Sequence, residues 1–208
     1  MPRPVSIEDE ALIERLSHCF RAVGYVGASL ADLSEATGLS KPALYHRFPG
    51  GKQQMAAEVL SAAGKWYEEH IFAPLRAEGE PAARLSLVAR QLDRFYASGR
   101  QACLLNMLSA PRSEDSPFAT AIKEMFETLL SVFAKFAEES GVSRGDARAR
   151  AARGVAMLHG SLVLSRGLGS NAPFKSFLAS LADDLLGPEA KPKSSTRPPR
   201  SKQPKRSS

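Results

Sequence analysis

The sequence has few of the residues from which disulfide-rich and zinc-binding proteins are built. Cysteine occurs only at Cys19 and Cys103, and the chain contains no Cys-x-x-Cys pair and no His/Cys cluster. Two isolated thiols are typical of a reducing compartment, and the missing cluster excludes the common structural zinc sites. We therefore expect no metal, and we interpret each cysteine as a small buried apolar residue, with a redox sensor as the alternative.

Long apolar runs are also absent. No stretch reaches the roughly 18–20 apolar residues that a membrane-spanning helix requires. The first ten residues, MPRPVSIEDE, lack the apolar core of a signal peptide. We therefore expect a cytoplasmic protein with no membrane partner.

The sequence offers no arrangement of residues for catalysis. The four histidines are scattered, and their spacing supports neither a Ser/His/Asp nor a Cys/His arrangement. No glycine-rich phosphate loop follows a strand. We expect neither an enzyme nor a cofactor.

Strand patterns are lacking too. Apolar residues recur at intervals of three and four, as on the buried face of amphipathic helices, and nowhere alternate. The pattern predicts an all-α protein of about nine helices. They are expected over residues 6–24, 30–37, 41–48, 51–72, 80–98, 101–109, 117–140, 146–167 and 173–186. Gly24 is expected to end the first helix, and the fourth is expected to stop before Pro74.

The net charge of +6 is confined to one end of the chain. Residues 188–208 hold seven of the 28 basic residues and one of the 22 acidic ones, so the remainder is neutral. This Pro/Lys/Arg/Ser-rich tail has too few apolar residues to fold, and we expect it to be disordered. It is either a solvated tail or a basic arm that binds DNA without sequence preference.

The stretch from Ser29 to Lys52 predicts two short helices joined by a tight turn. Ser29 and Ser40 precede apolar residues at helical spacing and are expected to cap the two helices. Gly38 suits the left-handed residue that closes the first helix, and Pro42 suits the first turn of the second. Such a pair fits either a DNA-binding helix-turn-helix or an ordinary helical hairpin.

The outward side of the second helix favours DNA binding. Leu44 is expected to face the core. The residues expected to face outward are Lys41, Pro42, Tyr45 and His46. Residues 40–52 include three basic residues and no acidic one, which suits a surface that meets phosphate. Arg47 is expected to face either DNA or Glu35 across the domain.

The N-terminal part of the chain resembles the DNA-binding domain of the tetracycline-repressor (TetR) family of bacterial regulators. The likeness is carried by the run GYVGASLADLSEATGLSKPALYHRFPGGKQQM and covers about residues 12–60. The sequence departs from the family at Gly50-Gly51, where one or two polar residues usually precede the lysine, so we expect a looser start of the next helix. The resemblance implies a ligand-responsive regulator, most commonly a repressor, that binds DNA as a homodimer.

From this resemblance and the helix pattern we divide the chain into three parts. Residues 1–52 are expected to form the helix-turn-helix domain, residues 53–187 a helical ligand-binding and dimerisation domain, and residues 188–208 the tail. The predicted contacts with a double-stranded DNA operator are Ser29, Ser40, Lys41, Pro42, Ala43, Tyr45, His46 and Lys52. Lys41, Pro42, Ala43 and Tyr45 are assigned to base edges, and the serines, Tyr45, His46 and Lys52 to phosphate.

A single helix-turn-helix reads only a few base pairs. Tight binding to a palindrome needs two copies spaced by about 34–36 Å or a multiple of it. We expect the last two helices to pack on their symmetry mates around a two-fold axis. The residues predicted for this interface are Val155, Leu158, Leu162, Phe174, Phe177, Leu178 and Leu181.

The resemblance also implies a small-molecule effector in the C-terminal body. The predicted lining is Trp66, Phe95, Leu105, Met107, Met125, Phe126, Phe133 and His159. Few charges fall on these inward stripes, so a mostly apolar or aromatic effector is expected, and an ordinary core is the alternative. In a different class of function, an architectural DNA-binding protein would act through the basic tail.

Overall fold

The computed structural model describes residues 9–109 and 116–187 of the 208-residue chain. Within these ranges the regular structure is helical and no strand occurs, which confirms the predicted all-α class. The elements are α1 (Asp9–Gly27), α2 (Leu30–Thr37), α3 (Lys41–Arg47), α4 (Gly51–Tyr67), η1 (Glu68–Phe72), α5 (Ala73–Arg76), α6 (Pro81–Phe95), α7 (Leu104–Leu108), α8 (Ala119–Glu139), α9 (Arg144–Leu168) and α10 (Ala172–Leu186). None of these helices is long and apolar enough to cross a membrane. The predicted start of the first helix, residues 6–8, and the basic tail lie outside the described residues.

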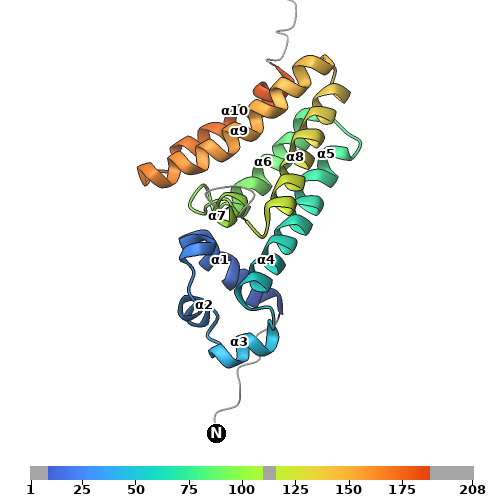
Figure 1. The fold of residues 1–208 in the computed structure, drawn as a ribbon. Coiled ribbons are helices and arrows are strands. Elements are labelled where there is room, and N and C mark those ends of the chain that lie inside the picture. The colour runs from blue at the N-terminus through green and yellow to red at the C-terminus, as the bar shows by residue number, and fades with distance from the viewer. Residues whose placement is uncertain (1–8, 110–115, 188–208) are drawn as a thin grey trace, which may run out of the picture.

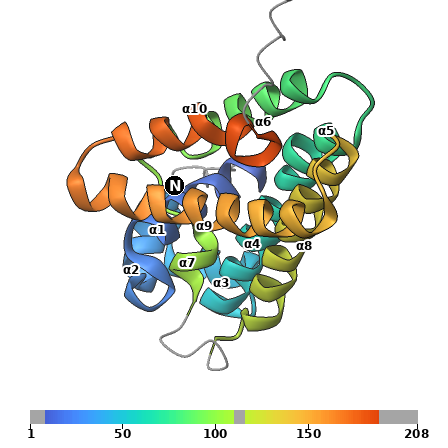
Figure 2. The ribbon, with the colours of Figure 1, turned by 90° about the horizontal axis from the view of Figure 1, so that it is seen from above.

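The two ends of the molecule are built from different helices. The first three helices gather at one end, with α3 outermost, and α9 and α10 lie side by side at the other (Figure 1; Figure 2). α9 packs against both α8 and α10, and α10 also contacts α6. The small N-terminal bundle joins the body through α4, which continues into it, and through contacts between α1 and α7.

The fourth predicted helix does not stop before Pro74. α4 continues through a π-helical turn, η1, into α5, and Pro74 lies in the first turn of α5. The wide turn is marked by the N–H of Ala73, which donates to the carbonyl of Glu68, five residues earlier. A proline is tolerated in the first turn of a helical segment because its missing N–H is not needed there.

α1 is interrupted at Gly24, where the sequence predicts its end. Gly24 has φ 76° and ψ 172°, and a further turn then runs to Gly27. A Cβ at Gly24 would lie 3.2 Å from the carbonyl oxygen of Met107. Glycine therefore meets two needs here, the left-handed backbone and the close approach of α7.

Arg21 occupies a buried position on α1 that the apolar pattern did not predict. It is 5% exposed, whereas the apolar Val23, two residues later, is 49% exposed. A guanidinium nitrogen donates to the carbonyl of Ala102, Nε donates to Ser17 Oγ at 3.3 Å, and the group lies 4.6 Å from the centre of the Phe95 ring. Burial lowers the pKa of Arg21, but a guanidinium stays charged in proteins. The cation therefore ties α1 to the segment before α7.

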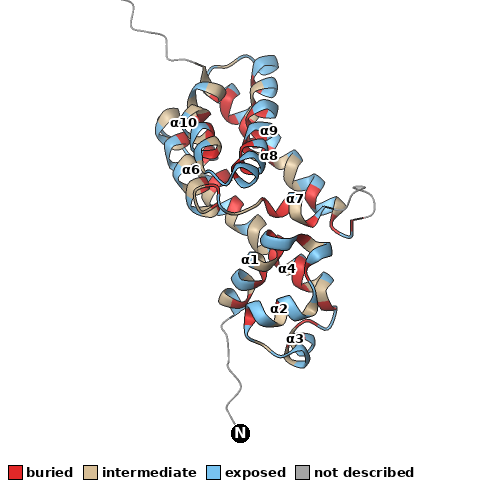
Figure 3. Ribbon diagram, turned by 90° about the vertical axis from the view of Figure 1, so that its left-hand side faces the viewer, coloured by how far each residue is buried: buried red, intermediate tan, exposed pale blue. Residues whose placement is uncertain are grey.

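The core of the body combines aliphatic and aromatic side chains, and Figure 3 shows buried residues on the inner faces of the helices. The hydroxyls of Tyr67 and Tyr96 are 2.7 Å apart and satisfy each other in this buried setting. Burial raises the pKa of both Tyr67 and Tyr96 well above the ordinary value, so both phenols stay neutral.

The loop between α6 and α7 is held against α10 at Gly99. This glycine has φ 85°, and a Cβ on it would lie 2.8 Å from the Cβ of Phe174. We expect Gly99→Ala to lower the free energy of unfolding by about 2–4 kcal/mol, through backbone strain and overpacking. Urea unfolding at fixed protein concentration measures this change.

Gly145→Ala is the matched control for Gly99→Ala. Gly145 lies in the first turn of α9, and a Cβ there meets nothing within 4 Å. We expect this variant to be as stable as the parent, or more stable by up to about 1 kcal/mol. Equal stability of the two variants would contradict the close packing at Gly99.

Candidate nucleic-acid interface and ligand hollow

α2 is fixed by caps at both of its ends. The backbone N–H of Asp32 donates to Ser29 Oγ at 3.2 Å, and the N–H of Ser29 donates to Asp32 Oδ2 at 2.8 Å, which forms a capping box. The bond from the Ser29 backbone lowers the pKa of Asp32. At the other end Gly38 adopts φ 72° and closes the helix. These local bonds confirm the predicted caps and set the direction in which the chain enters the turn.

The turn between α2 and α3 is built around a buried threonine that sequence reasoning missed. Thr37 is fully buried, and its Oγ1 donates to the carbonyl of Leu33 at 2.7 Å and accepts from the N–H of Leu39 at 3.3 Å. Arg15 on α1 donates to the Thr37 carbonyl at 3.0 Å. The polar groups of the turn are thus satisfied within the bundle, which holds α2 and α3 at a fixed angle.

α3 presents the outward face that the sequence predicts. Ser40 caps it, accepting from the N–H of Ala43 at 3.4 Å. Leu44 and Phe48 are 0% exposed and anchor the helix to the core. The exposed residues are Lys41, Pro42, Tyr45 and His46, while Ala43 is partly buried. The orientation is therefore as predicted, and contact of these side chains with DNA stays a prediction.

Lys52 is partly buried, and its ammonium group is bonded to backbone carbonyls of the bundle. Its Nζ donates to the carbonyls of Tyr25 at 2.9 Å and Ala28 at 3.0 Å, and it lies 4.7 Å from the centre of the Tyr25 ring. Two of the three ammonium donors are therefore used to hold the segment between α1 and α2 against α4. The assignment of Lys52 to phosphate from sequence missed this structural role, because the carbonyls come from a distant part of the chain.

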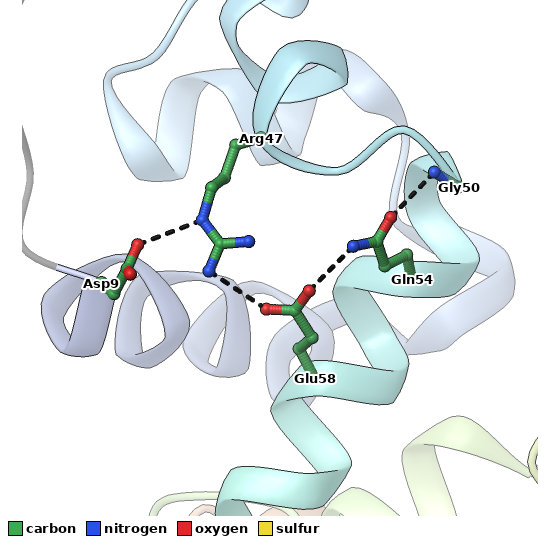
Figure 4. Close-up of polar contacts among 5 residues, drawn as sticks. All are labelled: Asp9, Arg47, Gly50, Gln54 and Glu58. Carbon is green, nitrogen blue, oxygen red and sulfur yellow. Dashed lines mark hydrogen bonds and ion pairs between the residues drawn. The ribbon is translucent and has the colours of Figure 1, made fainter.

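Arg47 pairs with Asp9 and Glu58 rather than with Glu35, one of its two predicted partners. Its Nε donates to Asp9 Oδ1 at 3.1 Å, and a terminal nitrogen donates to Glu58 Oε2 at 3.3 Å (Figure 4). The bond to Asp9 is the main cause of the raised pKa of Arg47. Gln54 extends the network, donating to Glu58 at 2.9 Å and accepting from the N–H of Gly50 at 2.8 Å. The charge of Arg47 is thereby matched by two acids and tied to α1 and α4.

A large hollow lies between α7, α8 and α9. It has a volume of about 1240 Å³ and is lined mostly by apolar atoms. Phe126 and His159 line it, as predicted for an effector site, together with Cys103, Leu130 and Val163.

The other six side chains predicted for a pocket do not face this hollow. Phe95, Leu105 and Met125 surround a cavity of only about 20 Å³, and Met125 also lines a second hollow of about 480 Å³ between α4, η1 and α8. Phe133 is fully buried, and Trp66 stacks on Phe95 with ring centres 4.2 Å apart. Met107 lies against Gly24 and accepts a bond from Arg166. The pattern identified buried side chains, but the tight packing of α4 and α6 makes most of them core.

The residues predicted for a dimer interface are also mostly core. Six of the seven are at most 6% exposed in the single chain, and only Leu178 is partly exposed. α9 and α10 direct these stripes toward each other, α6 and α8. The apolar residues that α9 leaves exposed are Met157, Val163, Leu164 and Leu168.

The capped helix pair, the buried anchors of α3 and its exposed basic and aromatic face define a helix-turn-helix DNA-binding module on an all-helical body. Comparison with known proteins identifies the family. A model of the bacterial regulatory proteins of the tetR family matches residues 12–59, and a model of the C-terminal domain of LmrA/YxaF-like transcriptional regulators matches residues 81–179. The chain belongs to the TetR family of transcriptional regulators.

Relatives and solved structures agree with this assignment. The HTH-type transcriptional regulator LmrA of Bacillus subtilis is 24% identical over 85% of this chain and 95% of its own length. The HTH-type regulator YxaF of the same organism, itself uncharacterised, is 28% identical over 75% of this chain and 83% of its own. A regulatory protein TetR from Rhodobacter sphaeroides has a TM-score of 0.72 at 20% identity, over 86% of this chain and all of that one.

A further solved structure of this fold contains DNA. It is a cysteine mutant of the TetR-family regulator CifR in complex with 26-base-pair double-strand operator DNA. It has a TM-score of 0.63 at 21% identity and covers 88% of this chain and 98% of that one. The likeness extends over both the N-terminal bundle and the body.

The two hydrogen bonds from Lys52 to the carbonyls of Tyr25 and Ala28, here called the Lys52 clamp, contribute to stability. Lys52→Met removes two charge-assisted hydrogen bonds and leaves two carbonyls without their partner, so we expect the free energy of unfolding to fall by about 1–3 kcal/mol. Lys41→Met removes the same charge from an exposed position and is expected to change it by less than about 0.5 kcal/mol. Urea denaturation of both variants compares them, and equal effects would contradict the clamp.

Proposed function

We propose that this protein is a ligand-responsive transcriptional repressor that binds a palindromic operator as a homodimer. The observation that carries the proposal is that α3 has one face buried in the core and another exposed to solvent. Leu44 and Phe48 fix the helix from behind, while the basic and aromatic residues on its other face have no partner in the described residues. Family membership and the regulators LmrA and YxaF support a role in transcription.

The exposed face of α3 supplies the contacts with DNA. Lys41 and His46 carry donors for phosphate or base edges, Tyr45 is 48% exposed, and Pro42 and Ala43 offer apolar contact to a thymine methyl. Ser29 and Ser40 accept cap bonds through their oxygens and keep their hydroxyl hydrogens for phosphate. Lys52 keeps one free donor and contributes chiefly by holding the bundle together.

The homodimer forms through the exposed stripe of α9. Met157, Gly160, Leu164 and Leu168 follow one another at intervals of three and four and therefore share one side of the helix. Leu164 is 56% and Leu168 is 69% exposed in the single chain, which is unfavourable for two large apolar side chains in water. Burying this stripe against its copy holds two reading heads at a fixed separation.

The effector is a small, mostly apolar or aromatic molecule that occupies the hollow between α7, α8 and α9. Arg166 lines this hollow and donates to the carbonyl of Ala22 on α1 at 3.0 Å. An occupant that displaces Arg166 would loosen α1 from the body. A coupling of about 1–3 kcal/mol between effector and operator corresponds to roughly a 5–150-fold change in affinity.

Selection of genomic fragments by the purified protein at physiological salt tests the DNA-binding role. We expect the wild type and a chain truncated after residue 187 to recover one palindromic sequence. Tyr45→Ala is expected to lose that recovery, because Tyr45 lies on the outward face of α3. Sequence-independent recovery that is lost with the tail would contradict the proposal and favour an architectural protein.

Salt dependence separates contact with DNA from support of the fold. Lys41→Gln is expected to reduce the slope of log affinity against log salt by about one per protomer. Arg47→Gln removes the same charge, but its guanidinium faces Asp9 and Glu58, so the slope should not change.

Sedimentation velocity tests the dimer. Leu164→Arg places a charge in the proposed interface and is expected to give monomers that no longer recover the palindrome. Leu87→Arg is the matched control, because Leu87 is an exposed leucine on α6, away from the stripe. A Leu164→Arg protein that stays dimeric would place the interface elsewhere.

A further inference from the structure

The hollow contains a thiol and an imidazole that the sequence keeps far apart. Cys103 immediately precedes α7, and His159 lies on the side of α9 that faces it. Cys103 is 5% exposed, and both residues line the same hollow. Their spacing in the sequence gave no sign of a Cys/His pair; the two come together because α9 packs against α8 and borders the same hollow as the segment before α7.

The hydrogen bonds of His159 fix its tautomer. Its Nδ1 lies 2.8 Å from the carbonyl oxygen of Val155, one turn earlier on α9. A carbonyl only accepts, so Nδ1 carries the proton and the neutral ring has its lone pair on Nε2. That Nε2 is buried and has no hydrogen-bond partner among the described residues. An unsatisfied base thus remains on the side of the ring available to the Cys103 thiol.

The surroundings of Cys103 favour its thiolate. Burial raises the pKa of the thiol, but His159 and the backbone N–H groups of Asn106 and Leu105 outweigh burial and leave the pKa lowered. For His159, burial lowers the pKa, while Cys103 and the Val155 carbonyl outweigh it and leave the pKa raised. Both shifts run toward a thiolate–imidazolium pair, which is how a cysteine becomes nucleophilic.

The other cysteine provides an internal comparison. Cys19 on α1 is partly exposed, and burial, followed by the charge of Asp32, raises the pKa of its thiol. Exposure alone would make Cys19 the more reactive thiol. The pairing with His159 makes the opposite prediction.

The walls of the hollow indicate what reaches this pair. Phe126 lies with its ring centre 5.0 Å from that of His159, and Leu130 and Val163 add aliphatic surface. Such walls favour an uncharged molecule with an apolar or aromatic body.

We propose that Cys103 and His159 form a reactive site for uncharged, apolar soft electrophiles, such as quinones and enones, and that the adduct weakens DNA binding. The thiol proton passes to Nε2 of His159, and the sulfur adds to the β-carbon of the electrophile. A C–S bond forms, the C=C electron pair moves onto the conjugated carbonyl as an enolate, and the imidazolium returns the proton. The product is a thioether, and no oxidant or reductant takes part.

The route from the adduct to the reading head is short. Ala102, the neighbour of Cys103, accepts through its carbonyl the bond from the buried Arg21 of α1. An adduct at Cys103 that shifts this carbonyl leaves a buried cation without its acceptor, which is costly. This step rests on the proposed function, whereas the chemistry at Cys103 does not.

Alkylation of the full-length protein by N-phenylmaleimide tests the site. Peptide mass spectrometry on the wild type follows both cysteines in one experiment, and we expect Cys103 to react about tenfold faster than Cys19. His159→Asn keeps a donor near the position of Nδ1 and removes Nε2. It is expected to slow the reaction of Cys103 by about tenfold, because the thiol loses the base that accepts its proton. Faster reaction of Cys19, or an unchanged rate in His159→Asn, would overturn the proposal.

The effect on DNA is measured with the palindrome that the wild type recovers. N-phenylmaleimide is expected to lower the affinity of the wild type by roughly 5–150-fold and to leave Cys103→Ser unaffected. N-phenylsuccinimide has the same shape without the reactive double bond and is expected to have little effect. A full adduct at Cys103 with unchanged affinity would overturn the regulatory half of the proposal.

The two proposals fail in different ways. If N-phenylsuccinimide lowers the affinity for the palindrome as much as the maleimide does, the proposed thiol chemistry is contradicted. The proposal of an effector site in the hollow would then still stand. If the untreated wild type recovers no palindrome, the proposed function as a transcriptional regulator is contradicted. The relative alkylation rates of Cys103 and Cys19 would still test the proposed reactive site.

Discussion

A helix of seven residues is too short to hold its shape in water, because one or two turns cannot offset the cost of starting a helix. α3 is such a helix, and it carries the residues proposed to read DNA. Its stability comes from Leu44 and Phe48, whose burial contributes about 1.5–3 kcal/mol each. The N-terminal bundle can be understood as the support for these two anchors: α1 and α4 provide the core, and Lys52 closes the segment that leads into α2.

The parts of this bundle that depend on neighbours in the sequence could be predicted from the sequence. The caps at Ser29 and Ser40 and the left-handed Gly38 follow from bonds that span two to four residues. The partners of Arg47 and Lys52 could not be predicted, because their carboxylates and carbonyls come from segments that only the fold brings near. The fold class was predictable for the same local reason, since the period of apolar residues needs no tertiary information.

The same distinction explains where the structure of the body differs from what the sequence predicted. A period of three to four identifies which side of α9 is buried, but it does not say whether the cover is the same chain or a second copy. Leu158 and Leu162 are covered by their own chain, whereas Leu164 lies on a different side of α9 and is exposed. The position of a hollow is even harder to predict from sequence, because a side chain that faces inward can either fill the space beside it or leave it empty. The Cys103–His159 pair belongs to this class of feature.

α9 combines two tasks that the proposals assign to separate partners. His159, Val163 and Leu164 line the hollow, and Leu164 and Leu168 are also largely exposed to solvent, so Leu164 belongs to both surfaces. A helix moves as a unit over such distances, so a roll that accommodates an occupant of the hollow also reorients the exposed stripe. Changes in effector preference and changes in the dimer would therefore be coupled through this one element.

The network from Arg47 through Glu58 and Gln54 to Gly50 joins α3 to α4 at both ends of the connecting loop. A reading helix held in this way does not change shape when α4 tilts, but is carried along with it. In a symmetric pair of such chains, the quantity under control is the distance between two unchanged reading surfaces. The number of base pairs between operator half-sites would then select which tilt of α4 is compatible with binding.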